Sequence, residues 1–113
     1  MRKERLQSAF QNELAQLVRT LKDPRFLPVG LVTITEVVLA PDLRTAKVWV
    51  SFSEKGDEIE EAAVTALNRA AGKLRGELAR RLVLRRAPEL QFLRDRGAEM
   101  SNRIDELLRG EDV

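Results

Sequence analysis

The sequence of 113 residues contains no cysteine and no histidine. Without cysteine the chain can form no disulfide and has no thiol nucleophile, and without either residue the usual zinc sites are excluded. Histidine is also the commonest general base, so the serines have no partner that could activate them. The glycine patterns of Walker and Rossmann nucleotide sites are missing as well. We therefore expect a protein that is not an enzyme and that binds no metal and no cofactor.

Long apolar runs are also absent, because no stretch approaches the roughly 20 residues that a membrane-spanning helix needs. The basic start, Met1 to Arg5, has no apolar stretch after it and does not resemble a secretory signal. A chain of 113 residues that is 43 % hydrophobic fits one small domain with a modest core. We expect a cytoplasmic monomer with no membrane partner, and the absence of cysteine fits a reducing compartment.

Hydrophobic periodicity predicts an α+β domain. Three helices are expected: residues 3–21, a helix with Asp57 as N-cap and Glu60 as its capping-box partner, and an arm after Gly72 with leucines at 74, 78 and 82. Strands are expected at 30–39, 45–52 and 90–94, and the first two should form an antiparallel hairpin. In this order the helices would cover one face of a three-stranded sheet.

A further short helix is expected near the C-terminus. Met100, Ile104, Leu107 and Leu108 recur there at helical spacing. We therefore divide the chain into a domain over residues 1–96 and a helical extension over residues 97–113.

The charge of the chain is unevenly distributed, although it sums to only +2. Residues 54–61 hold five acids and one lysine, whereas residues 69–86 hold seven basic residues and one acid. Gly72 lies close to this change of sign, inside a long apolar-periodic stretch. It is either a tolerated glycine in one long helix, at a cost of roughly 1 kcal/mol, or a break that turns the second arm across the sheet. The change of charge favours the break.

A basic strip of this kind either binds phosphates or is only the solvated face of a helix. Helical phase favours Arg69, Lys73 and Arg80 as phosphate contacts, because they lie off the predicted buried stripes. Arg81 falls at the apolar edge, and Arg85 would fall on the stripe if the helix ran that far, so the helix should end sooner. The expected RNA-binding set is Arg69, Lys73, Arg75, Arg80, Arg81, Arg85 and Arg86.

The single tryptophan has two interpretations. Trp49 shares a strand face with Lys47 and Ser51, so it can either pack within the fold or serve as a platform for a stacked base. One isolated aromatic residue favours packing.

Taken in order, several segments resemble the ribosome-binding factor A family, which assists assembly of the bacterial small ribosomal subunit. The matching segments are Lys22-Asp-Pro-Arg25, Val32-Thr-Ile-Thr35, Pro41-Asp-Leu43, Ala46-Lys-Val48, Ala70-Ala-Gly72, Leu84-Arg85, Pro88-Glu-Leu90 and Leu107-Leu108. Single residues match at Leu67, Arg75, Leu78, Phe92, Asp95 and Ile104. Their order and spacing over nearly the whole chain make the resemblance specific.

The resemblance implies a type II KH-like fold with an interhelical Ala-x-Gly kink, here Ala70, Ala71 and Gly72, in place of the Gly-x-x-Gly loop of RNA-binding KH domains. It implies binding to immature small ribosomal subunits, contact with their RNA near the decoding region, and support for processing of that RNA. A GTPase would help release, and cold adaptation is a theme of the family. Gly97 departs from the family, which usually has serine there, so a role for that hydroxyl is not carried over.

Two other functions stay open on the sequence. A free-standing KH-like module would bind single-stranded nucleic acid, although the missing Gly-x-x-Gly argues against it. A protein-interaction domain would use the basic strip only for solvation. Binding to small subunits, binding to free single strands, or indifference to RNA would distinguish the three.

Overall fold

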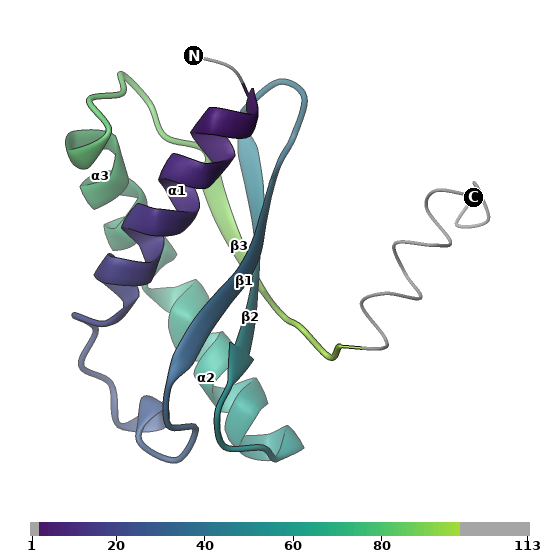
Figure 1. Ribbon diagram of the computed structural model, residues 1–113. Coiled ribbons are helices and arrows are strands. Elements are labelled where there is room, and N and C mark those ends of the chain that lie inside the picture. Colours follow the sequence, from purple (N-terminus) through teal and green to yellow (C-terminus); the bar gives the residue numbers. More distant parts are fainter. Residues whose placement is uncertain (1–2, 98–113) are drawn as a thin grey trace.

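The computed structural model describes residues 3–97. The element order is α1 (Lys3–Val18), η1 (Pro24–Phe26, a turn of 3-10 helix), β1 (Val32–Leu39), β2 (Thr45–Phe52), α2 (Asp57–Arg69), α3 (Ala71–Arg81) and β3 (Glu89–Arg94). The three α-helices lie on one face of the sheet (Figure 1). This confirms the predicted α+β arrangement. The helix expected from Met100 to Leu108 lies outside the described residues, and of the extension over residues 97–113 only Gly97 is described.

The sheet has the strand order β1-β2-β3, so β2 is central. It pairs antiparallel with β1, where Val37 lies opposite Val48, and parallel with β3, where Val48 lies opposite Phe92. The parallel pairing follows from the connection, because α2 and α3 carry the chain back along the sheet before β3 begins. A register shift between Ile34 and Glu36 marks a bulge in β1. This is the type II KH-like topology.

Alternation along the strands directs one set of apolar side chains toward the helices. The largest fully buried side chains come from every layer of the fold: Phe10, Leu14, Val29, Leu39, Val48, Val50, Leu67, Leu74, Leu78 and Phe92. Burying one such side chain contributes about 1.5–3 kcal/mol, so this single core is the main source of stability. Trp49 is also buried, with 6 % of its surface exposed, which agrees with packing rather than with an open stacking platform. Within residues 3–97, no helix combines the length and the apolar content that crossing a bilayer requires.

Amide side chains from the helices hold both edges of the sheet. On β3, Asn68 donates to the carbonyl of Phe92 at 3.1 Å and accepts from its N–H at 2.8 Å. On β1, Gln11 donates to the carbonyl of Ile34 at 3.0 Å, while a second α1 amide, Gln7, accepts from the N–H of Leu39 at 3.0 Å. These bonds fix α1 and the end of α2 against the sheet and satisfy edge groups that could otherwise pair with another chain.

Two predicted boundaries were wrong by a few residues. The first helix ends at Val18 rather than at residue 21, because both the N–H and the hydroxyl of Thr20 donate to the carbonyl of Leu17 and close the last turn. The first strand begins at Val32 rather than at residue 30, because Gly30 has a φ of +69° and turns the chain just before it.

The N-cap of α2 is Gly56, so the prediction of Asp57 in that role was wrong. Asp57 is the first helical residue, and its carboxylate contacts Arg94 instead of capping the helix. Glu60 still satisfies the N-cap backbone, because its carboxylate accepts from the N–H of Gly56 at 2.9 Å, but it lies four residues after the N-cap rather than the three of a capping box.

Candidate nucleic-acid interface

The break between α2 and α3 lies at Ala70, which ends one helix and starts the next. Its N–H donates to the carbonyls of Ala66 and Leu67, and its own carbonyl accepts from the N–H of Leu74. The break therefore falls two residues before Gly72, which lies in the first turn of α3 without a positive φ. The chain therefore changes direction between α2 and α3 at the small residues Ala70 and Ala71, and not through a glycine in a left-handed conformation.

The break leaves the N-terminus of α3 without a side-chain cap. The first N–H groups of a helix have no partner inside it and form the positive end of its dipole. In one continuous helix these groups would be bonded to the preceding turn, so the junction creates donors that suit an anion. A Cβ added to Gly72 would meet no atom within 4 Å, so the backbone here is open to close approach.

Two unpaired cations flank this N-terminus. Arg69 is the last residue of α2 and Lys73 lies in the first turn of α3; both are exposed. Arg85 and Arg86, in the loop between α3 and β3, are exposed as well. Within residues 3–97 none of the four forms an ion pair, so their charges remain available to an external phosphate.

Arg75 forms contacts within the protein that stabilise the fold. Its Nε donates to the carbonyl of Ala87 at 2.8 Å, and its Nη1 lies 4.0 Å from Oε1 of Glu89. The side chain thereby ties α3 to the segment that leads into β3.

Arg80 and Arg81 are also engaged within the protein. Arg80 points outward, as helical phase predicts, but it pairs with Glu77 on the same helix. Arg81 contacts the Glu13 carboxylate of α1 at 3.2 Å. Helical phase predicts the direction of a side chain but not which residue it will contact. The sequence alone therefore could not distinguish Arg80 and Arg81, which form ion pairs, from the cations that form none within residues 3–97.

A shallow groove of about 580 Å³ runs between α3 and the segment before β3. Gly72 and Gly76 lie one turn apart along it, and a Cβ added to either would meet nothing within 4 Å. The full lining is Gly72, Arg75, Gly76, Ala79, Arg86, Ala87 and Glu89. The side chains of Arg75 and Arg86 thus border a strip of bare helix backbone next to the α2–α3 junction.

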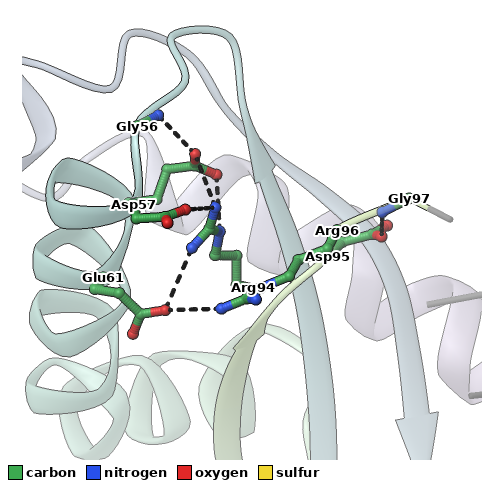
Figure 2. Close-up of polar contacts among 8 residues, drawn as sticks. Gly56, Asp57, Glu61, Arg94, Asp95, Arg96 and Gly97 are labelled. Atoms are coloured by element: carbon green, nitrogen blue, oxygen red, sulfur yellow. Dashed lines mark hydrogen bonds and ion pairs between the residues drawn. The ribbon is translucent and has the colours of Figure 1, made fainter. Parts of the chain in front are cut away.

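The opposite end of α2 is acidic, and Arg94 at the end of β3 neutralises much of it (Figure 2). Its guanidinium lies 2.7 Å from Asp57, 3.1 Å from Glu60 and 3.5 Å from Glu61. The hydrogen bond from Arg94 lowers the pKa of Asp57, and the same bond raises the pKa of Arg94. Over its 13 residues, α2 separates this acidic end from the basic junction by about 18 Å.

Arg94 was predicted as a strand residue but not as the centre of a charge network. A signal was present, because Arg94 has the same strand parity as Leu90 and Phe92 and must point toward the helices. A cation directed inward requires an acidic partner, and the acidic start of α2 was the obvious candidate.

Residues 2–108 match the family model for ribosome-binding factor A. The chain belongs to the ribosome-binding factor A family. It is 41 % identical over 117 residues to the ribosome-binding factor A of Aromatoleum aromaticum, with 99 % of this chain and 89 % of the relative covered. It is 43 % identical over 110 residues to that of Desulfitobacterium hafniense, with 96 % and 85 % covered.

Solved structures of the ribosome-binding factor A family have the same fold. The crystal structure from Thermus thermophilus is 35 % identical, with a TM-score of 0.72 over 82 % of this chain and 94 % of that one. The solution structure of a Thermotoga maritima protein is 39 % identical, with a TM-score of 0.71 over 83 % and 87 %. A Thermus thermophilus ribosome-binding factor A fitted into the cryo-EM map of a 30S–RbfA complex is 35 % identical, with a TM-score of 0.66 over 79 % and 90 %.

In this member of the ribosome-binding factor A family, η1 carries a local charge pair near the α2–α3 junction. The backbone N–H and the Nη2 of Arg25 donate to the two Asp23 carboxylate oxygens at 2.9 and 2.7 Å. The Arg25 guanidinium is the main reason that the pKa of Asp23 falls from 3.8 to about 2, and Arg69 contributes weakly. The loop before β1 is therefore held by a carboxylate that stays charged in the folded protein.

Removing the Arg25 charge should shift the titration of Asp23. Because folding lowers this pKa, the stability from the pair is fully present above pH 3.8 and is lost as pH falls through about 2. In Arg25→Gln the Asp23 pKa should rise toward 3.8, and the carboxyl ¹³C shift followed by NMR measures it. A midpoint that stays near 2 in the variant would contradict the assignment of the cause to Arg25.

Proposed function

We infer that this chain is a non-catalytic assembly factor that binds immature small ribosomal subunits through their RNA and supports processing of that RNA. The observation that carries the proposal is the α2–α3 junction, where an uncapped helix N-terminus lies between the unpaired cations Arg69 and Lys73. Helix N-termini and exposed cations are the groups that contact RNA phosphates. The Thermus thermophilus relative described in a 30S–RbfA complex supplies the partner.

The junction suits folded RNA better than a free single strand. Single-strand binders usually stack bases on accessible aromatic rings. In the described residues Phe10, Phe52, Phe92 and Trp49 are buried, and Phe26 is partly buried against the core. Phosphate contacts position a protein on RNA without reading bases, so selection of the subunit would depend on the shape of the RNA surface.

The family resemblance extends the proposal. Release from the maturing subunit would be assisted by a GTPase, and the factor would matter most during growth in the cold. We propose that the chain acts in the cytoplasm as a monomer, with no chemistry of its own.

Co-sedimentation tests the proposed function directly. The protein is expected to sediment with free small subunits but not with large subunits or translating ribosomes. Tight binding to free single-stranded RNA, without preference for small subunits, would instead identify a general single-strand module. Failure to bind RNA or ribosomal particles of any kind would leave the basic surface with a role in solvation only.

Replacing Gly72 with alanine should raise stability and lower small-subunit binding at the same time. Alanine favours a helix over glycine by roughly 0.8–1 kcal/mol, and the added Cβ meets no protein atom within 4 Å. A gain of that size raises the melting temperature of a small domain by about 4–8 °C. A phosphate bound against the backbone of the first turn would, however, meet the new methyl group.

Gly76→Ala is the matched control, because Gly76 is a helical glycine with equal space but lies one turn beyond the N-terminus. Its stability should rise similarly, with a smaller loss of binding. Thermal melts and small-subunit binding measure the two effects. If Gly72→Ala binds as tightly as the unaltered protein, close approach to this backbone is ruled out.

A further inference from the structure

The loop before β1 presents two large apolar side chains to solvent. Leu27 is 82 % exposed and Leu31 is 75 % exposed, while Val29 between them is fully buried. A single exposed leucine is ordinary on a protein surface. What distinguishes Leu31 is a fixed backbone and an apolar groove beside it.

The backbone around Leu31 is held by the end of β2. The N–H of Leu31 donates to Oγ of Ser53 at 2.8 Å, and the N–H of Ser53 donates back to the carbonyl of Leu31 at 3.0 Å. Gly30 has a φ of +69°, and a Cβ added there would lie 2.2 Å from the same Oγ. The loop therefore cannot easily fold Leu31 back against the core.

A groove of about 290 Å³ lies beside Leu31, between the end of α1 and the start of β1. Its lining is mainly apolar: Val18, Arg19, Leu21, Phe26, Gly30, Leu31, Val32 and Thr33. Arg19 is its one charged residue, and it forms no ion pair within residues 3–97. The groove thus offers apolar contact together with one available positive charge.

The edge of β1 is open at this groove. In Figure 1, β1 forms the edge of the sheet next to α1. The amide of Gln11, on α1, donates to the carbonyl of Ile34 at 3.0 Å, so this carbonyl points to the outer side of β1. Antiparallel pairing alternates, so Val32, two residues earlier, has its backbone groups on the same outer side. No described group bonds to them there. Val32 therefore offers one N–H and one carbonyl at the strand edge, and such edge groups can pair with an extended chain.

We propose that this groove binds an extended segment of a partner protein, which pairs with the β1 edge at Val32 and seats an apolar side chain against Leu31. A carboxylate of the segment would lie opposite Arg19. The inference rests on the proposed function in one respect, because it takes the partner to be a protein of the same immature small subunit. Strand pairing requires a peptide backbone, and RNA has none, so the open edge favours a protein over RNA at this surface.

The test compares Leu31→Ser with Arg69→Gln/Lys73→Gln on two ligands: immature small subunits, and the RNA extracted from them without protein. Loss of one buried leucine contact should weaken Leu31→Ser binding to subunits at least roughly tenfold and leave binding to the extracted RNA unchanged. The double variant should weaken binding to both ligands. Leu43→Ser, at an exposed leucine in the β1–β2 turn, is the matched control and should change neither. Melting temperatures should be unchanged for both serine variants.

A photo-crosslinking residue, p-benzoylphenylalanine, in place of Leu31 identifies the partner. A covalent adduct with a protein of the subunit is expected. An adduct with RNA alone, or equal loss of binding to both ligands in Leu31→Ser, would assign this surface to RNA and overturn the proposal. Unchanged subunit binding by Leu31→Ser would overturn it too. Failure of the proposed function gives a different result from failure of this inference. If the proposed function is wrong, the unaltered chain binds neither ligand, and the partner proposed here is then excluded as well.

Discussion

Replacing Arg94 with methionine is expected to destabilise the protein by about 3–5 kcal/mol, a large part of the stability of a small domain. Glu60 is the reason, because only 5 % of its side chain is exposed and Arg94 is its ion-pair partner at 3.1 Å. Removal of one member of a buried pair leaves an uncompensated charge in a poorly solvated place. Asp57 and Glu61, the other partners, are exposed and can be hydrated. Chemical denaturation with the linear extrapolation measures the loss.

Two further variants separate the buried charge from the loss of side-chain packing. In Arg94→Met/Glu60→Gln the amide can still accept the N–H of Gly56, but the buried charge is gone, so most of the lost stability should return. Arg80→Met breaks an exposed pair with Glu77 and should cost no more than about 1 kcal/mol. Equal losses for the two arginine variants, or no recovery in the double variant, would show that the buried charge is not the cause.

Much of the fold could be predicted because the signals are local. Alternation at Ala46, Val48 and Val50 marks the central strand, and leucines spaced by four mark α3. The family resemblance added the type II KH-like fold. The parts that were missed depend on particular hydrogen bonds that no periodic pattern specifies. One is local, because the N–H and the hydroxyl of Thr20 both donate to Leu17 and close α1 early. Others join residues far apart in the sequence, because the amides of Gln11 and Asn68 hold the edges of the sheet.

The candidate site was predictable as a segment but not residue by residue. The basic strip and the kink region follow from the charge change near Ala70. Which cations stay available is decided by partners elsewhere, such as Glu13 of α1 for Arg81 and the carbonyl of Ala87 for Arg75. The sequence favoured a break at Gly72, whereas the structure has it at Ala70, so the uncapped N-terminus of α3 was expected two residues too late.

Replacing Arg69 and Lys73 together with glutamine is expected to weaken binding to immature small subunits by roughly tenfold or more near physiological salt. Each cation that neutralises a phosphate releases a condensed counterion. The slope of log affinity against log salt should therefore become shallower by about 1.4–1.8 units when two contacts are lost. Both side chains are exposed and form no ion pair within residues 3–97, so stability should stay within about 0.5 kcal/mol of the unaltered protein.

Arg80→Gln provides the comparison that decides between a phosphate site and a generally basic surface. Arg80 is an exposed cation of the same helix, but its charge is already shared with Glu77. If position at the N-terminus of α3 matters, Arg80→Gln should change the salt slope much less than Arg69→Gln or Lys73→Gln alone. Affinities measured at several salt concentrations for the three single variants give the result. Equal changes in slope would mean that the surface attracts RNA only through its net charge, and the α2–α3 junction would then have no special part in binding.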